Sequence, residues 1–175
     1  MPIAINTPLS KKELVKLKAG DRVLISGTIY TARDAAHQAF GAEPPFNPAG
    51  AIIYYASPTP TPPGKVIGSI GPTTSSRMDA FTPALLKQGL SGMIGKGRRS
   101  KEVVTAIKKY KAVYFVVPGG TAALLSKHVD RARVIAYPEL GAEAVHELAV
   151  ANFPAIVAID SKGVDLFNEK CKIKN

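Results

Sequence analysis

The chain has 175 residues, 46% of them hydrophobic, which is enough for one α/β domain with a substantial core and short for two. The formal net charge is +10, from 23 Lys and Arg against 13 Asp and Glu, so nucleic acid, acidic protein surfaces and small anions are all electrostatically suitable partners. The single cysteine, Cys171, excludes an internal disulfide, and the three histidines show no zinc-ligand spacing. We expect one domain over residues 1–175, with no metal held by this chain.

Basic residues form only modest clusters, at residues 11–12, 96–101, 108–111 and 170–174. No RNA- or DNA-binding motif accompanies them, so nucleic acid is not the expected partner. No apolar run approaches the roughly 20 residues needed to span a bilayer, and the first residues do not resemble a signal segment. A cytoplasmic protein without membrane contact is the expectation.

In chain order, the predicted elements alternate between helix and strand. Ser10 and Glu13 form the capping box of a first helix that ends at Gly20. Strands are expected at residues 21–30, 51–55, 65–70, 93–94, 112–117, 133–137 and 155–159. Helices are expected at residues 31–40, with Thr31 as N-cap, and at 78–86, 100–110, 121–125 and 141–149. Apolar strands separated by short helices predict an α/β fold with a mostly parallel sheet and flanking helices.

Three polar loops follow predicted strands, at the edge where open α/β sheets bind ligands. Residues 28–37 contain Arg33, Asp34 and His37. Residues 71–79 read Gly-Pro-Thr-Thr-Ser-Ser-Arg-Met-Asp, and residues 95–97 read Gly-Lys-Gly. Arginine grips a carboxylate with two parallel hydrogen bonds and lysine adds a compact positive charge, so the loops favour a dicarboxylate or hydroxy acid.

Each loop also has a structural interpretation without a ligand. The neighbours Arg33 and Asp34 can be a solvated helix-end pair, and the Thr/Ser run can be a turn with an N-cap. Residues 95–97 can be a loop with an exposed lysine, and they lack the spacing of a phosphate-binding P-loop. The residue types alone leave both interpretations open.

Four strings decide between them: Thr-Ala-Arg-Asp-Ala-Ala-His at 31–37, Gly-Pro-Thr-Thr-Ser-Ser-Arg-Met-Asp at 71–79, Ile-Gly-Lys-Gly at 94–97 and Tyr-Pro-Glu-Leu-Gly at 137–141. In this order they resemble the β subunit of the class I fumarate hydratases and of the related L-tartrate dehydratases, equivalent to the C-terminal domain of the single-chain forms. The resemblance extends from about residue 11 to residue 167. It implies a swivelling β/β/α domain and an α subunit as partner, in an α2β2 or other hetero-oligomer. It also implies a [4Fe-4S] cluster that three cysteines of the α subunit hold.

The resemblance also implies roles for individual residues. Arg33, Arg77 and Lys96 match ligands of the substrate carboxylates. Thr73 matches a substrate-binding residue proposed as the base that removes the C3 proton, although a threonine hydroxyl is a poor base unless a neighbour takes its proton. The residues expected to support this site are Asp34, His37, Thr74 and Asp79.

Three functions stay open. Residues 31–37, 78–79 and 137–144 look more like the fumarases, so reversible hydration of fumarate to (S)-malate is expected. Ser75 and Ser76 replace an Ala-Gly pair common in fumarases and have some tartrate-enzyme character, which makes conversion of L-tartrate to oxaloacetate the alternative. From another class, the basic chain can be a binding or scaffold module without chemistry of its own.

Overall fold

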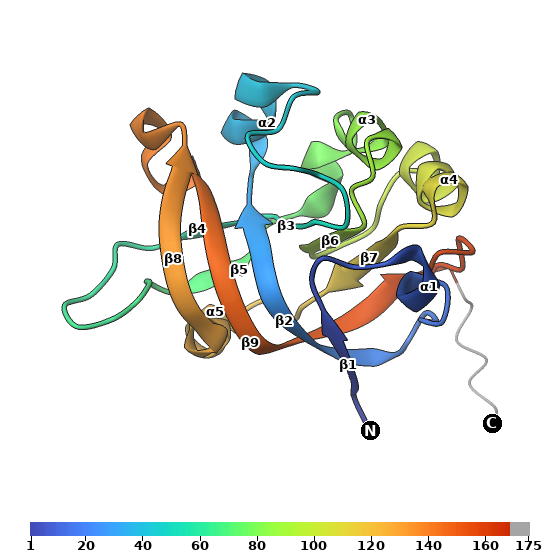
Figure 1. The fold of residues 1–175 in the computed structure, drawn as a ribbon, viewed down its shortest axis with the longest axis horizontal. Helices are drawn as coiled ribbons and strands as arrows, with labels where there is room; N and C mark the ends of the chain where they lie inside the picture. Colours follow the sequence, from blue (N-terminus) through green and yellow to red (C-terminus); the bar gives the residue numbers. More distant parts are fainter. Residues whose placement is uncertain (169–175) are drawn as a thin grey trace.

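The computed structural model describes residues 1–168 (Figure 1). Cys171 and the basic cluster at residues 170–174 lie outside the described residues. The elements, in chain order, are β1 (Ile3–Asn6), α1 (Lys11–Leu14), β2 (Arg22–Thr31), α2 (Asp34–Phe40), β3 (Ile52–Tyr54), β4 (Ala56–Pro58), β5 (Ile70–Pro72), the 3-10 helix η1 (Ser75–Met78), α3 (Thr82–Lys87), β6 (Gly92–Gly95), α4 (Lys101–Tyr110), β7 (Val113–Val116), α5 (Ala122–Leu125), η2 (Ser126–His128), β8 (Val129–Ala136), η3 (Pro138–Glu143) and β9 (Val145–Ile159).

The main sheet closes on itself. Its strand order is β1-β2-β3-β6-β7-β9-β8, and β2 also pairs with β9 along its whole length, so β2, β3, β6, β7 and β9 form a ring. The β1-β2-β3-β6-β7 pairings are parallel, whereas β9 is antiparallel to β2, β7 and β8. A small second sheet pairs β4 with β5. Closure leaves the five ring strands paired on both sides, which stabilises the short strands β3 and β6.

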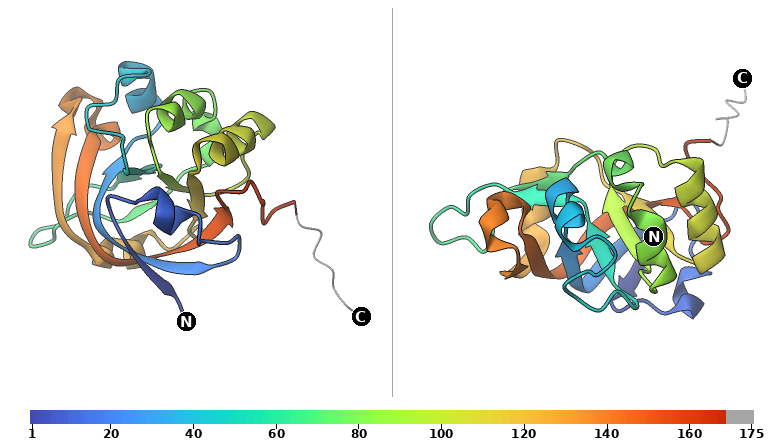
Figure 2. Two further views of the ribbon diagram at one scale, coloured as in Figure 1. Left: turned by 45° about the vertical axis from the view of Figure 1, so that its right-hand side comes forward. Right: turned by 90° about the horizontal axis from the view of Figure 1, so that it is seen from above.

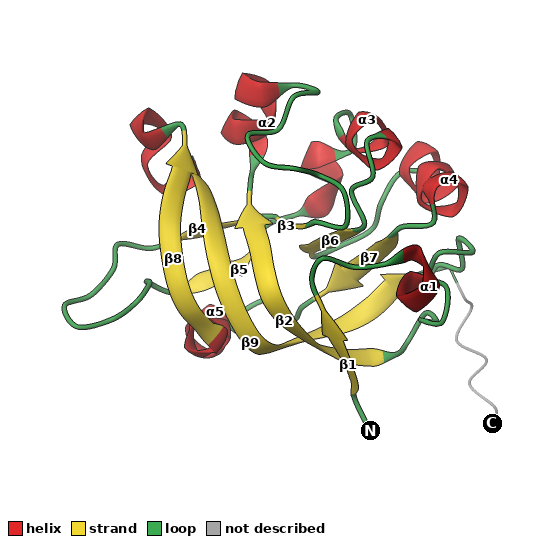
Figure 3. Ribbon diagram, in the orientation of Figure 1, coloured by secondary structure: helices red, strands yellow, loops and turns green. Residues whose placement is uncertain are grey.

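The sheet separates two hydrophobic clusters. The first fills the ring interior with side chains such as Ile25, Ile29, Tyr54 and Phe115, and also includes residues of β1 and α1. The second lies between the outer face of the sheet and α2, α3 and α4, which lie side by side in Figures 1 and 2. The colouring of Figure 3 shows these helices gathered on one side of the strands. The loops at that side carry the polar residues expected to be functional.

Strand β2 alternates buried and half-exposed residues up to Ile25, and then its register against β9 shifts at Gly27. Gly27 has φ +108°, and a Cβ there would lie 2.4 Å from the Thr7 hydroxyl oxygen. Only glycine suits this backbone conformation beside so close a neighbour. The extra residue at the register shift lies on β9, where Phe153 and Val150 are three residues apart against two on β2, so both side chains stay buried.

Most predicted elements are present, and the parallel part of the predicted sheet is confirmed. The sheet is mostly parallel and also mixed, since β9 runs antiparallel to β2, β7 and β8. Residues 141–149 were expected to form a helix, but they complete η3 and begin the 15-residue strand β9. Helix-forming residues adopt a strand there because β2 and β8 offer pairing partners on both sides.

Other boundaries also differ, and α1 ends at Leu14 instead of continuing to Gly20. Thr31 is the last residue of β2, and Arg33 is the N-cap of α2. The Thr31 hydroxyl does not cap the helix, because it accepts a hydrogen bond from the His146 amide of β9. Of the strand expected at residues 65–70, only Ile70 is in β5. The helix expected at 78–86 is divided into η1 and α3. The proline-rich approach to β5 and the turn at Asp79 favour these irregular segments.

Among the described residues, none of the helices combines the length and the apolar character that crossing a bilayer requires.

Candidate functional site

The four residues expected to bind substrate follow the ends of three strands. Arg33 comes two residues after β2, Thr73 and Arg77 follow β5, and Lys96 follows β6. Backbone hydrogen bonds bring the last two segments together: the Lys96 amide donates to the Thr73 carbonyl oxygen at 3.3 Å, and the Ser75 amide donates to the Lys96 carbonyl oxygen at 3.0 Å. The loops that carry Thr73 and Lys96 therefore lie against each other as a short parallel bridge.

Arg33 and Arg77 meet around one carboxylate. The Nε atom of Arg77 lies 3.0 Å from Oδ1 of Asp34, and Nη2 of Arg33 lies 3.9 Å from Oδ2. The Arg77 side chain is 53% exposed, while those of Arg33 and Asp34 are each 26% exposed. Arg33 also places Nη1 3.4 Å from the Ser57 hydroxyl on β4. Two guanidiniums therefore converge beside the small β4–β5 sheet that leads into Thr73.

Glu143 is a member of this cluster that the sequence analysis missed. Its Oε1 atom lies 3.2 Å from Nε of Arg33, although the two residues are 110 positions apart in the chain. Glu143 ends η3, which begins inside the Tyr-Pro-Glu-Leu-Gly string and extends two residues beyond it. That string was recognised as a motif, but only tertiary contact between α2 and η3 shows that its acidic end reaches an arginine.

His37 is buried behind the cluster. Its Nδ1 atom bonds the Arg33 carbonyl oxygen at 2.8 Å, and its ring packs against Phe40, Tyr55 and Phe81. Nε2 is buried without a hydrogen-bond partner among the described residues. Burial lowers the pKa of His37 to about 4, against opposing effects of the Arg33 carbonyl and Asp34, so the ring is neutral at pH 7. His37 supports the turn that presents Arg33 and does not face solvent.

The other two supporting residues take different positions. Thr74 is exposed and lies opposite Lys96 in the backbone bridge. Asp79 contacts neither Arg33 nor Arg77, and instead accepts a hydrogen bond from Arg99 Nε at 2.6 Å. The expected roles of both residues stay predictions.

Together these groups can bind and polarise a small dianion. Arg33, Arg77 and Lys96 bring three cationic side chains to the ends of neighbouring strands, and Lys96 is exposed. The Thr73 hydroxyl forms no hydrogen bond with any other described residue, which leaves it available to a ligand. Within residues 1–168, no three His, Cys, Asp or Glu side chains lie together as a metal would require.

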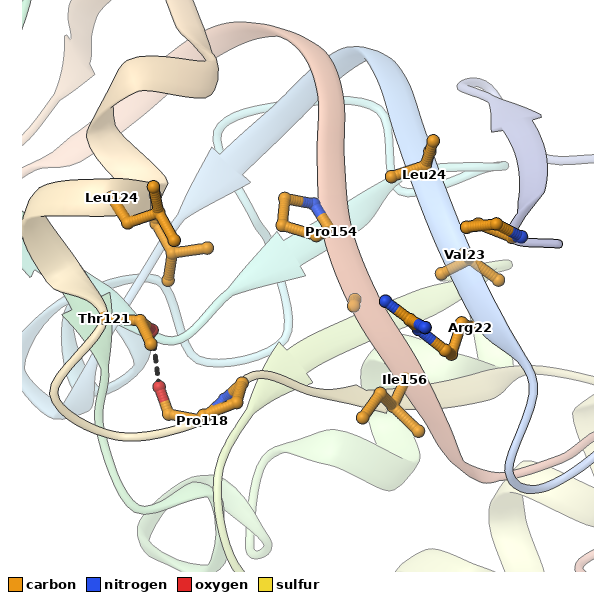
Figure 4. A pocket seen from close by; sticks show the side chains of 11 residues that line it. Arg22, Val23, Leu24, Pro118, Thr121, Leu124, Pro154 and Ile156 are labelled. Atoms are coloured by element: carbon orange, nitrogen blue, oxygen red, sulfur yellow. Dashed lines mark hydrogen bonds between the residues drawn. The ribbon is translucent and has the colours of Figure 1, made fainter.

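An apolar groove of about 230 Å³ lies elsewhere, between α5, β2 and β9 (Figure 4). Leu24, Leu124, Pro154 and Ile156 line it, and among the described residues that line it only Arg22 is charged. None of the four expected substrate ligands belongs to this groove. Its apolar lining does not suit a dicarboxylate.

Comparison with known proteins gives consistent matches. The chain is 38% identical over 177 aligned residues to fumarate hydratase 2 of Leishmania major and to the aerobic class I fumarate hydratase of Salmonella typhimurium, with 95% of the chain covered in both. It covers only 31% and 30% of those two proteins, so it spans about a third of the fumarases that it matches. It is 43% identical over 173 residues to a putative L(+)-tartrate dehydratase subunit beta of Methanocaldococcus jannaschii, covering 92% of this chain and 89% of that subunit.

A family model described as "Fumarase C-terminus" matches residues 1–170, almost the whole chain. The match includes all four strings from which the resemblance was inferred, and every residue of the candidate site. The chain therefore belongs to the fumarase C-terminus family.

Proposed function

We propose that this chain is the β subunit of a two-subunit hydro-lyase that interconverts fumarate and (S)-malate by reversible addition of water. The observation that carries the proposal is the convergence of Arg33 and Arg77 on Asp34, next to the bridge that joins the Thr73 and Lys96 loops. Arginine and lysine side chains at adjacent strand ends suit a dicarboxylate. Family membership and the 37–38% identity to fumarate hydratases support this substrate class.

In the proposed reaction, the cations of this chain act on developing charge. Removal of a proton from C3 of malate leaves an electron pair that delocalises onto the neighbouring carboxylate. Positive groups at Arg33, Arg77 and Lys96 stabilise that charge more in the transition state than in the bound substrate. Thr73 is the candidate acceptor of the C3 proton. Departure of the C2 hydroxyl, with a proton, as water is assigned to the partner chain.

The [4Fe-4S] cluster implied by the family does not fit the described residues. The chain has one cysteine, Cys171, which lies outside the described residues, whereas the cluster requires three cysteine ligands. The candidate site itself offers arginine, lysine and threonine, which are not cluster ligands. We assign the cluster to an α subunit, in an α2β2 or other hetero-oligomer. The 43% identity to a protein named as a subunit beta supports a two-chain enzyme.

The swivelling β/β/α domain is part of the same proposal, with residues 1–175 as one such domain. The closed strand ring, with α2, α3 and α4 gathered on one side, supports it. The exposure of Arg77 and Lys96 supports a site at this surface that a second chain can complete.

L-Tartrate is the second candidate substrate. The 43% identity to the putative tartrate dehydratase subunit of Methanocaldococcus jannaschii exceeds the 38% identity to fumarate hydratase 2 of Leishmania major, which favours tartrate. The Escherichia coli L(+)-tartrate dehydratase subunit beta is only 30% identical, which favours fumarate. Both substrates are dicarboxylates and both fit the same cations.

The test is anaerobic assay of the chain co-expressed with its candidate α subunit and supplied with iron and sulfide. We expect malate from fumarate, with activity lost in Thr73→Ala and absent from the isolated chain. If oxaloacetate from tartrate is the dominant product, the assigned substrate changes to tartrate and the assigned site stays the same. Inactivity of the reconstituted complex on both substrates would refute the hydro-lyase and favour the basic scaffold module, whose measurable property is salt-sensitive binding of a polyanion.

A further inference from the structure

A buried arginine lies three residues after Lys96. The Arg99 side chain has no exposed surface, and its Nε donates to Asp79 Oδ1 at 2.6 Å. Its Nη2 donates to the Thr82 hydroxyl at 2.8 Å and to the Tyr55 hydroxyl at 3.3 Å. Burying a charge is costly unless it is paired and hydrogen-bonded, so this arrangement needs a reason beyond filling space.

The guanidinium also lies between two aromatic rings. Its central carbon is 5.3 Å from the ring centroid of Tyr55 and 4.9 Å from that of Tyr114. Burial by itself would lower the pKa of Arg99, but Tyr55 and Asp79 raise it, and the net shift is upward. The side chain therefore stays cationic, and its attraction to both rings strengthens in the dry environment.

Asp79 connects two segments through this arginine. While Oδ1 accepts from Arg99, Oδ2 accepts from the Ser100 backbone amide at 2.7 Å. Asp79 directly follows η1, the turn that contains Arg77, and Ser100 is the N-cap of α4. One carboxylate thus ties the end of the Thr73–Arg77 segment to the end of the Lys96 loop.

Tyr114 makes a second connection at the other end of the same loops. Its hydroxyl lies 2.8 Å from Ser75 Oγ and 2.9 Å from the Gly97 carbonyl oxygen. Ser75 begins η1, and Gly97 directly follows Lys96. Tyr114 comes from β7, a strand of the closed ring, so the rigid part of the fold provides this support.

We propose that Arg99 and Tyr114 are positioning residues that hold the Thr73–Arg77 segment and the Lys96 loop in one fixed arrangement. The inference rests on the proposed function for its catalytic meaning. Tyr114 contacts Ser75 and Gly97 on these two segments, and Arg99 contacts Thr82 and Tyr55. Tyr55 is itself bonded to the first segment, because its carbonyl oxygen accepts a hydrogen bond from the Thr73 amide at 2.7 Å. Substrate ligands must be held to within a fraction of an ångström, which loops achieve only with such support.

The first test measures amide hydrogen exchange in the full chain, for Tyr114→Phe and Arg99→Lys. Tyr114→Phe keeps the ring and removes only the hydroxyl, and Arg99→Lys keeps the charge and removes the fork of donors. We expect exchange of the Ser75 and Lys96 amides to accelerate about tenfold or more, with the β2–β9 ladder unchanged. Unchanged exchange, or equal acceleration everywhere, would overturn the proposal.

The second test measures malate kinetics of Tyr114→Phe, Arg99→Lys and Arg99→Met in the complex with the α subunit. A positioning role predicts a rise of about fivefold or more in KM, larger for Arg99→Met than for Arg99→Lys. The matched control is Arg98→Gln, because the neighbouring Arg98 is exposed and donates to Asn168 instead. Wild-type kinetic constants in both Tyr114→Phe and Arg99→Met would overturn the proposal.

The two proposals fail in different ways. If the wild-type complex does not hydrate fumarate or dehydrate tartrate, the proposed function fails. The exchange experiment still decides whether Arg99 and Tyr114 hold the two loops together, because it needs neither the partner nor a substrate.

Discussion

Asp34 ties together the two arginines of the candidate site. It faces Arg77 at 3.0 Å and Arg33 at 3.9 Å, and Glu143 faces Arg33 at 3.2 Å. Partly exposed ion pairs of this kind contribute little to stability, about 0–1 kcal/mol. The two arginines are thus oriented by their acidic neighbours and remain able to bind an incoming carboxylate.

In the complex with the α subunit, Arg77→Ala should lower kcat/KM for malate. The lost bidentate contact is worth about 2–5 kcal/mol of transition-state stabilisation. Arg77→Lys should restore only part of it, since an ammonium lacks the planar fork. Steady-state kinetics of both variants against the matched control Arg133→Ala, which removes an exposed arginine of β8, checks this. Wild-type kinetic constants in Arg77→Ala would show that Arg77 does not bind the substrate.

His37 should make stability depend on pH. Its folded pKa is about 4 against an ordinary value of 6.5, so the unfolded chain binds a proton first as the pH falls. The contribution of His37 to the free energy of unfolding is therefore fully present above pH 6.5. It decreases by about 3 kcal/mol as the pH falls to 4. His37→Phe should flatten this decrease in urea unfolding series, with a remainder from His146, whose pKa burial also lowers. An equally steep decrease in His37→Phe would contradict the assignment.

At the scale of elements, the strand ends are packed closely enough to limit side-chain size. A Cβ at Gly95, the last residue of β6, would lie 1.9 Å from Ser75 Oγ and 3.0 Å from Tyr55 Cδ2. Because glycine has no Cβ, η1 can approach β6 at this point, and the Thr73 and Lys96 loops come into contact.

Gly95→Ala should therefore destabilise the fold by about 1–3 kcal/mol through overpacking. Chemical denaturation measures the loss. Gly119→Ala is the control, because a Cβ at Gly119 meets nothing within 4 Å and its backbone φ is not positive. Equal stability of the two variants would show that the approach of η1 to β6 is not sterically limited.

The sequence predicted elements well where local pattern and tertiary context agree. Helix α4 has its N-cap Ser100 and buries one apolar face, and it was expected within a residue of its observed bounds. The helix predicted at residues 141–149 was wrong because local helix propensity competes there with pairing to two distant strands, β2 and β8. Pairing of that kind cannot be deduced from the residues of one segment.

At the scale of the whole molecule, closure of the ring couples distant parts of the chain. Phe153 of β9 is fully buried and packs edge-on against Tyr54 of β3, with ring centroids 5.3 Å apart. The Tyr54 hydroxyl donates to the Ile70 carbonyl oxygen at 3.0 Å, which reaches β5. The ring interior thus connects the last strand to the segment that carries Thr73.

Phe153→Ala should lower the free energy of unfolding by about 3–5 kcal/mol, since it leaves a cavity in the ring interior. Because the strands share this core, far-UV circular dichroism and tyrosine fluorescence should report one coincident transition. The control Val134→Ala, at a side chain 47% exposed, should change stability by about 0.5 kcal/mol or less. Separate transitions for the two probes would show that the layers unfold independently.

The sequence by itself determined the α/β class, the order of most elements, the family and the candidate ligands Arg33, Thr73, Arg77 and Lys96. These follow from local apolar patterns and short strings, which the residues carry wherever they lie. The tertiary structure alone decided the closure of β2 on β9, the contact of Glu143 with Arg33, and the pairing of Asp79 with Arg99. Each of these contacts joins residues that are far apart in the chain, and the two ion pairs also select one charged partner among several. Such choices depend on distance and burial, which exist only once the chain has folded.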